Sequence, residues 1–266
     1  MSVVRIILAL FVSLSIITAQ VLAADLPGTT YRTATDKNGL TFTIAPLNGW
    51  VPGMKGTVGV FGARASVDVT PIDILRNIGD LVDALDGLYI GSGEVRYGKI
   101  GFLYDIYYMK ASLTREIDGR FISGGLELGF RQSTSTLAGT YRVMQTSTSH
   151  VDAIAGVRIW DVKVDLGVDI NDRSLFTSDG DRWVDAIVGV KGRTAIAPNL
   201  SLSGWAMIGA GGSDLTWDLY GGVNYEVRKG FDLSLGFRGM SADYSKGSFK
   251  WDIIQYGPVL GATFKF

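Results

Sequence analysis

The chain has 266 residues, no cysteine and a formal net charge of −1. A charge so close to neutral argues against a nucleic acid or another polyanion as partner, and the lack of cysteine excludes disulfides and thiolate chemistry. The 35 glycines, 11 tyrosines and 6 tryptophans are typical of strands joined by tight turns and edged with interfacial aromatic rings.

The first residues have the features of a secretory signal peptide. Arg5 supplies the charged start, residues 6–17 form an apolar run, and small residues lead up to Ala23. The run is shorter than the about 20 apolar residues that a membrane-spanning helix needs. We therefore expect residues 1–23 to be cleaved and residues 24–266 to form one domain.

The last strand, expected at residues 251–266, shows the pattern that dominates the chain. From Tyr256 onward its even positions are apolar and end in Phe264 and Phe266, whereas its odd positions are small or polar except for Val259. A period of two predicts a strand with different solvents on its two faces. In an outer-membrane barrel the apolar face contacts lipid and finishes on an aromatic residue at the interface.

The same alternation recurs along the chain, and glycines and charges interrupt every later apolar run, so membrane insertion would have to use a closed β-barrel. Short and longer links alternate, as they do between the two ends of such barrels. The longer links are expected at 114–120, 171–181 and 243–250. Strands are expected at 41–50, 54–61, 65–69, 87–97, 100–113, 122–145, 150–168, 182–196, 199–211, 214–227, 230–243 and 251–266.

These segments predict an all-β fold: an antiparallel up-and-down transmembrane barrel. Twelve is the favoured strand number, because an even number lets the first and last strands close antiparallel. Ten or fourteen remain as alternatives, since 122–145 could hide a turn and the three early strands are short.

One stretch near 71–85 breaks the alternation. Thr70 is suited to cap a helix, Pro71 to begin it and Asp73 to complete a capping box. Apolar residues then recur at spacings of three and four, which predicts a short amphipathic helix that could break at Gly79. We favour packing at the barrel mouth, with a plug or lid inside the lumen as the alternative.

Alternation also predicts which charges face inward, because Arg or Lys on the lipid face costs about 2–4 kcal/mol at mid-depth. Six positive and seven negative side chains fall on the expected inner faces and nearly cancel. An internal ion-pair network is the favoured interpretation, and a water-filled path that screens small polar solutes is the alternative. The candidate lumen charges are Glu94, Arg96, Asp105, Arg142, Asp152, Arg158, Asp185, Lys191, Arg193, Asp218, Glu226, Asp232 and Arg238.

Catalytic and metal-binding patterns are weak. The one histidine, His150, follows Ser147 and Ser149 in an expected short turn, far from any external lipid substrate, so we expect a solvated residue rather than the base of a serine–histidine pair. With no cysteine and one histidine, we expect no metal cluster, no cofactor and no enzyme. We interpret 178–181 as a turn rather than a calcium loop, and 209–212 as a flexible external link rather than a phosphate loop.

Five of the six tryptophans lie near expected strand ends, where aromatic girdles form. The exception is Trp205, which is expected in mid-strand on the inner face. We favour a space-filling role for Trp205 over a constriction or a ligand-stacking surface.

Several stretches resemble known proteins. The ending, with Gly261, Phe264 and Phe266, resembles the C-terminal assembly signal of outer-membrane barrels, although Val259 stands where a polar residue is usual. Together with 67–75, 151–160, 213–217 and 257–266, it resembles a broad family of uncharacterised outer-membrane β-barrel proteins of Gram-negative bacteria. Similar sequences usually carry an acid and more glycine where this chain has 205–208.

The resemblance implies a bacterial outer-membrane location, contact with outer-membrane lipid and lipopolysaccharide, and recognition by the barrel-assembly machinery. It implies no activity. Our first hypothesis is therefore a narrow, charge-lined pore for small polar solutes. The second is a closed barrel with structural or surface-interaction work, and an outer-membrane lipid-modifying enzyme is the least favoured.

Overall fold

The computed structural model describes residues 39–118, 123–170 and 173–266, so the expected signal peptide lies outside the described residues. Neither helix in these ranges is long and apolar enough to cross a membrane. The helices are α2 (Pro71–Arg76) and α3 (Ile78–Ala84); the strands are β1 (Leu40–Trp50), β2 (Gly53–Val60), β3 (Ala63–Val69), β4 (Leu85–Tyr97), β5 (Ile100–Asp118), β6 (Ser123–Gln145), β7 (Ser149–Ile170), β8 (Arg173–Ala197), β9 (Leu200–Gly211), β10 (Leu215–Arg228), β11 (Phe231–Lys246) and β12 (Phe249–Lys265).

Ten strands form a closed ring. Each strand from β4 to β12 pairs antiparallel with the next, β1 pairs with β4, and β1 also pairs with β12. The expected all-β antiparallel barrel is therefore confirmed. The favoured prediction of twelve barrel strands was wrong. The alternative of ten is correct, because β2 and β3 lie outside the ring.

The first two strands run in line along a single partner. Trp50 pairs with Val259 of β12, and three residues later Gly53 pairs with Tyr256 of the same strand. Pro52 separates them, and proline cannot donate a ladder hydrogen bond. Since β3 pairs with β2 and not with β4, the three early strands supply one barrel strand and one added hairpin.

The break between β1 and β2 needs a glycine on β12. A Cβ at Gly257 would lie 1.8 Å from the carbonyl oxygen of Val51, and the Val51 amide donates to the Pro258 carbonyl at 3.1 Å. A side chain at this position would force the closing strands apart.

The outer surface of the ring is apolar around the whole circumference. On β10, for example, Leu219 and Val223 are 51% and 41% exposed, whereas Asp218, which directly precedes Leu219, is fully buried. Exposed apolar side chains of this kind need lipid as their solvent. We call them the apolar belt; its members include Phe42, Val95, Phe102, Leu137, Val157, Val188, Ile208, Leu219, Leu235 and Leu260.

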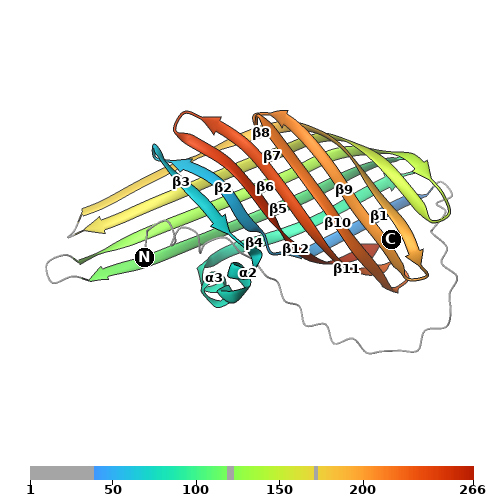
Figure 1. The fold of residues 1–266 in the computed structure, drawn as a ribbon, viewed down its shortest axis with the longest axis horizontal. Coiled ribbons are helices and arrows are strands. Elements are labelled where there is room, and N and C mark those ends of the chain that lie inside the picture. Colours follow the sequence, from blue (N-terminus) through green and yellow to red (C-terminus); the bar gives the residue numbers. More distant parts are fainter. Residues whose placement is uncertain (1–38, 119–122, 171–172) are drawn as a thin grey trace.

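The two ends of the barrel differ. Short turns join β4 to β5, β6 to β7, β8 to β9 and β10 to β11 at the end where Leu40 and Phe266 also lie, which is typical of the periplasmic side. At the other end the hairpins β5–β6 and β7–β8 extend beyond the remaining strands (Figure 1). These strands have 19 to 25 residues, against the about 9–11 that cross a membrane.

The long strands correct the expected links. Residues 114–118, 173–181 and 243–246 belong to strands rather than to loops. The alternation of apolar and polar residues is lost there, because a hairpin outside the membrane needs no lipid-facing apolar side; Leu175 and Phe176, for example, are adjacent and both exposed. The polar composition of these strand ends therefore led to the wrong prediction of links.

The predicted helix forms as two short helices that connect β3 to β4. Thr70 and Asp73 make the expected capping box, and their hydrogen bonds lower the pKa of the Asp73 carboxyl. The break falls at Asn77 rather than at Gly79. Figure 1 shows both helices projecting from the wall near the start of β4, outside the lumen. The alternative of a plug in the lumen was therefore wrong.

We predict that Gly257→Ala destabilises the folded barrel by about 1–3 kcal/mol, because the added methyl group meets backbone that cannot move freely. Urea unfolding followed by heat-modifiable gel migration measures the change. Gly221→Ala is the matched control, since a Cβ there meets nothing within 4 Å. Equal midpoints for the two variants would contradict the proposed close approach.

Candidate functional site: the filled lumen and its outer mouth

All thirteen candidate lumen charges lie on the inward sides of their strands, and most of them meet in three groups. The first group is at the centre of the barrel. Arg238 of β11 binds Asp218 at 2.7 Å and Asp105 at 2.7 Å, and Asp218 also accepts from Arg158 at 2.8 Å. Arg158 and Asp218 have no exposed side-chain surface. We call these four residues the central quartet.

Aromatic rings enclose the central quartet. The Arg238 guanidinium lies 5.3 Å from the ring centroid of Trp50 and 5.3 Å from that of Trp205. The Trp205 indole also donates to Asp218 at 2.8 Å. Trp205 thus lies on the inner face as expected, and it fills space while it orients a buried carboxylate.

The second group lies closer to the short-turn end. Arg96 binds Asp152 at 2.7 Å and Glu94 at 2.5 Å, and Arg142 binds Asp152 at 2.8 Å. Lys191 of β8 pairs with Glu94 of β4. Every member of this group has an oppositely charged partner.

The third group uses a residue near the chain end. Asp232 accepts from Arg193 at 2.6 Å and from Lys265 at 2.5 Å. Glu226 is the cross-strand neighbour of Asp232. Asp185 stands apart from the ion pairs, because it accepts hydrogen bonds from the backbone and the hydroxyl of Ser213 at 2.7 and 2.8 Å.

Three sets of contacts cross the lumen. Arg238 to Asp105 joins β11 to β5, and Lys191 to Glu94 joins β8 to β4. Gln132 of β6 and Gln255 of β12 exchange two amide hydrogen bonds of 2.9 and 3.0 Å. In the ring of ten strands, each of these contacts joins strands separated by three others. The interior is therefore bridged at several levels.

The outer half of the lumen is filled by apolar side chains, most of them aromatic rings and methionines. Trp183 stacks on Tyr244 with 4.0 Å between centroids, and Phe130 stacks on Trp251 at 6.2 Å. These side chains are nearly all buried. They are Trp50, Met54, Tyr107, Met109, Phe130, Trp160, Val162, Trp183, Met240, Tyr244, Phe249, Trp251 and Ile253.

This cluster corrects the expected aromatic girdle. Trp50, Trp160, Trp183 and Trp251 are at most 4% exposed and point into the barrel. The signal that could have found them is parity. Trp160, for example, lies two residues after Arg158 and therefore points to the same, inner face. Its position in the alternation predicts its direction better than its nearness to an expected strand end does.

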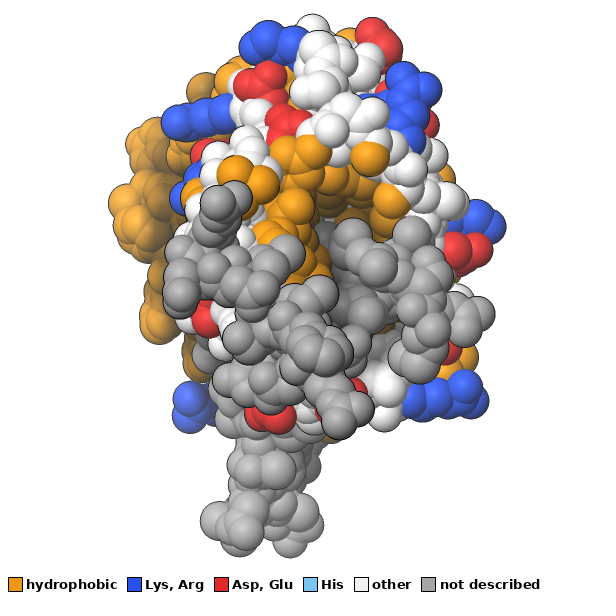
Figure 2. Space-filling view, turned by 90° about the vertical axis from the view of Figure 1, so that its left-hand side faces the viewer, with side chains coloured by type: hydrophobic (Ala, Val, Ile, Leu, Met, Phe, Trp, Pro, Cys, Tyr) orange, Lys and Arg blue, Asp and Glu red, His pale blue; other side chains and the backbone are white. Residues whose placement is uncertain are grey.

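Above the cluster the inner walls stay apolar. Leu113, Leu128 and Leu166 are direct neighbours across β5, β6 and β7, and all three belong to or pack against the buried cluster. Figure 2 looks onto this end and shows a hollow lined by hydrophobic side chains. We call this hollow the apolar mouth.

Two acids of β8 hold neighbouring hairpins. Asp179 accepts from the Phe61 amide at the β2–β3 turn at 2.6 Å, and Asp181 accepts from the Tyr244 hydroxyl at 2.7 Å. Residues 178–181 lie within strand β8 and pair with β7, so the expected turn was wrong. The expected flexible link at 209–212 was also wrong for its first three residues, because 209–211 belong to β9 and pair with β8.

The remaining candidates show little chemistry. His150 is partly buried at the start of β7, at the short-turn end. No group of three or more potential metal ligands occurs within the described ranges. A cavity of about 170 Å³ lies between the first two charge groups, with Leu103, Ile154 and Met207 among its lining residues. That volume is below the about 300–1,000 Å³ of ligand pockets.

The C-terminal residues close the ring. Phe264 packs against Phe231 with 4.9 Å between centroids, and Phe266 exchanges backbone hydrogen bonds with Phe42. A Cβ at Gly261 would lie 2.6 Å from the Ser234 hydroxyl. Recognition of this ending by the assembly machinery stays a prediction.

No protein-family model and no curated protein matches the chain. Among solved structures, the outer membrane protease OmpT from Escherichia coli is similar over 90% of this chain and 99% of its own, at 10% identity and a TM-score of 0.51. The translocator domain of autotransporter NalP from Neisseria meningitidis (12% identity, 87% and 90% covered, TM-score 0.40) and Ail of Yersinia pestis (10%, 85% and 97%, 0.31) are looser matches.

The closed ring, the apolar belt and the likeness to OmpT agree. The chain is a β-barrel of the bacterial outer membrane. At these identities the similarity extends to the fold alone, and the solved structures include a porin and an attachment protein as well as a protease. The activity has to come from this chain's own residues.

We predict that Arg238→Met destabilises the barrel by about 3–5 kcal/mol, because removing one partner of a buried ion pair leaves uncompensated charge. Urea unfolding in detergent micelles measures the loss. Arg238→Met combined with Asp105→Leu should recover part of it, since Asp218 keeps Arg158. A double variant as unstable as the sum of its singles would contradict a direct coupling between Arg238 and Asp105.

Proposed function

We propose that this protein is a closed outer-membrane barrel that acts through its cell-surface end and does not conduct polar solutes. The observation that carries the proposal is the set of contacts across the lumen, from Arg238 to Asp105, from Lys191 to Glu94 and between Gln132 and Gln255. A solute would have to break all three sets of contacts and then pass the apolar cluster in the outer half of the lumen.

The size of the ring supports a filled interior. Barrels of eight strands are packed with side chains, whereas 16 to 18 strands leave an aqueous channel. With ten strands this lumen is near the small limit. Its opposite charges pair with one another, so they stabilise the wall instead of presenting a charged path. The pore hypothesis therefore has less support than the closed barrel.

The same end of the barrel offers a surface for interaction. The hairpins β5–β6 and β7–β8 extend beyond the other strands at this end (Figure 1), and the apolar mouth lies at the same end (Figure 2). Exposed apolar surface rimmed by polar residues is typical of binding sites. We infer a partner that contributes apolar groups at the cell surface.

We also propose that the protein is not an enzyme. Its one histidine, His150, lies at the short-turn end, whereas the accessible mouth is at the other end. A serine–histidine pair would need both groups within hydrogen-bond reach of a substrate at the mouth.

In planar bilayers we expect refolded protein to give no single-channel steps, because the cross-lumen contacts leave no continuous water path. A porin refolded and measured in the same way is the positive control. Reproducible steps from the intact chain would overturn the closed-barrel proposal and favour the pore.

Deletion of residues 71–85 tests whether the two helices block a path through the barrel or whether the barrel is closed without them. We expect the deleted protein to stay silent as well, because α2 and α3 lie outside the lumen. Conductance that appears only after the deletion would mean that the helices block a path, and it would contradict their position in Figure 1.

A further inference from the structure

The wall of the barrel has one line without strand pairing above the closed ring. β4 begins at Leu85, opposite Ala111 of β5, whereas β5 continues outward to Asp118. The place above β4 is taken by β3, because β2 continues the line of β1 along β12 and β3 follows β2. Among the described strands, however, β3 pairs with β2 alone. We call the line between β3 and residues 112–118 of β5 the unpaired seam.

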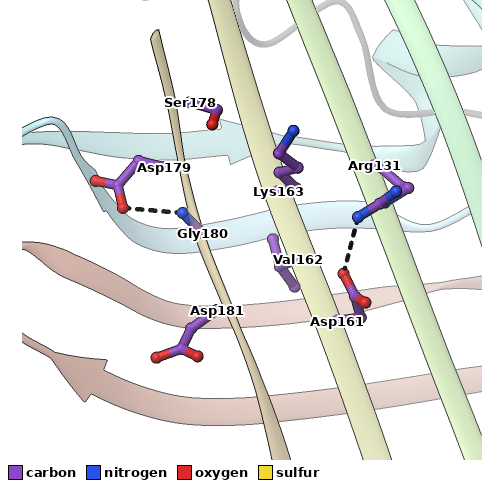
Figure 3. Close-up of a pocket in the computed structure, with 8 residues that line it drawn as sticks. All are labelled: Arg131, Asp161, Val162, Lys163, Ser178, Asp179, Gly180 and Asp181. Atoms are coloured by element: carbon purple, nitrogen blue, oxygen red, sulfur yellow. Dashed lines mark hydrogen bonds and ion pairs between the residues drawn. The ribbon is translucent and has the colours of Figure 1, made fainter.

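The tip of the β2–β3 hairpin is held away from β5. The Phe61 amide donates to one carboxylate oxygen of Asp179 at 2.6 Å, and the Gly180 amide donates to the other at 2.8 Å. Figure 3 shows Asp179 beside Gly180 on β8. Strand β8 lies three strands further round the ring from β5. The anchor of the hairpin therefore does not draw the two edges of the seam together.

The helices α2 and α3 lie at the lower end of the seam. On one side, a Cβ at Gly53 of β2 would lie 2.5 Å from the ring of Pro71, the first residue of α2. On the other side, Asp86 follows α3 directly, pairs with Lys110 of β5 at 3.3 Å and accepts from Ser112 at 3.1 Å. The two helices thus reach from the β2 side to the β5 side. We call them the helical sill.

The apolar belt fixes the height of the sill. On β5 the outward positions from 100 to 108 are Ile, Phe, Tyr, Ile and Tyr, and the next is Lys110. Leu85, directly after α3, pairs with Ala111, three residues beyond Tyr108. In a strand tilted by about 40°, three residues rise roughly 8 Å. The headgroup layer extends about 5–8 Å beyond the hydrocarbon, so the sill lies among the headgroups of the outer leaflet.

The sill is apolar on two sides. Ile74 and Ala84 are 5% and 8% exposed and belong to the buried cluster of the lumen, whereas Ile72, Leu75 and Val82 are 59%, 43% and 54% exposed. Short helices at a membrane surface bury such exposed apolar side chains among the lipids. The sill therefore joins the apolar cluster inside the barrel to the lipid outside it.

The inner faces of β6 and β7 stay apolar above the sill. Beyond Gln132 and Val162, both of which point inward, each second residue toward the hairpin tips is apolar. Several of these residues are only half-buried, so they keep apolar surface in contact with water, and covering that surface is favourable. We call these residues the upper wall; they are Leu126, Leu128, Phe130, Val164, Leu166 and Val168.

Charge at the sill favours an uncharged ligand. The two helices carry one cation, Arg76, and three acids, Asp73, Asp80 and Asp83, and all four residues are exposed. Exposed charges interact over a distance of about 8–10 Å at physiological salt. A phosphate or carboxylate headgroup beside the sill is therefore repelled.

We propose that the upper wall binds the alkyl chain of an uncharged amphiphile, such as a long-chain alcohol or ester. The chain enters from the outer leaflet over the helical sill and through the unpaired seam, while the polar end stays among the headgroups. Binding removes the upper wall from water, which supplies the driving force. This proposal rests on the cell-surface function proposed above and names the ligand that contributes the apolar groups.

The test is photolabelling of the refolded protein in phosphatidylcholine nanodiscs with hexadecanol that carries a diazirine in its alkyl chain. Mass spectrometry maps the attachment sites. We expect attachment to Leu128 and Val164 as well as to belt residues such as Leu235. An excess of plain hexadecanol should remove the attachment at Leu128 and Val164 alone, because a binding site saturates and bulk lipid does not. Attachment confined to the belt would overturn the proposal.

Two sets of variants test the site and the route. Leu166→Asp should lower attachment at Leu128 at least about tenfold, because an unpaired carboxylate is costly to bury against a hydrocarbon chain, whereas Leu166→Met should keep it. Ile72→Asp/Val82→Asp places two charges on the sill and should slow attachment at Leu128. Equal attachment in Leu166→Asp and Leu166→Met would overturn the site, and an unchanged rate in the sill variant would overturn the route. Heat-modifiable migration confirms that each variant is folded.

A charged probe tests the ligand class. Hexadecyl sulfate with the same diazirine should attach at Leu128 at least about fivefold less than the alcohol does, because its charge meets the acids of the sill. Equal attachment by the two probes would overturn an uncharged ligand. A barrel that is silent in planar bilayers and shows no attachment at Leu128 would overturn this proposal alone, whereas channel steps would overturn the closed barrel.

Discussion

The interior of this barrel depends on the pairing of Arg238 with Asp105 and Asp218. A buried guanidinium is tolerated only where its charge and its donors are met, and here two carboxylates and two indole rings meet them. The pairing joins strands on different sides of the ring. It therefore holds the wall together, and the closed barrel that we propose depends on the same contacts that stabilise the fold.

Much of this architecture could be predicted from alternation alone. Lipid outside and paired charge inside impose opposite demands on neighbouring residues, so the period of two is strong on strands such as β10, where Asp218 is buried and Leu219 exposed. The same rule placed the lumen charges on their faces. It could not say which of them would pair, because Arg238 and Asp105 are 133 residues apart and meet only after the ring closes.

The predictions that were wrong have identifiable physical reasons. Strand number was wrong because β1 and β2 each look like a separate strand, and nothing local shows that both run along β12. The tryptophans were misplaced because position near an expected strand end was preferred to parity. Residues 173–181 were mistaken for a loop because a hairpin outside the membrane loses the alternation of apolar and polar residues, which is the signal that lipid supplies.

The unequal lengths of the strands have a further consequence. Strand β8 pairs with β9 only from Asp185 onward, so within the described residues its first half borders no neighbour of the ring on that side. A bare strand edge at a cell surface invites pairing with other chains. Here Asp179 and Asp181 draw the tips of the β2–β3 and β11–β12 hairpins toward it, and the charges and Gly180 make it a poor template. The tall wall therefore ends in a strand edge that is a poor template for pairing with another chain.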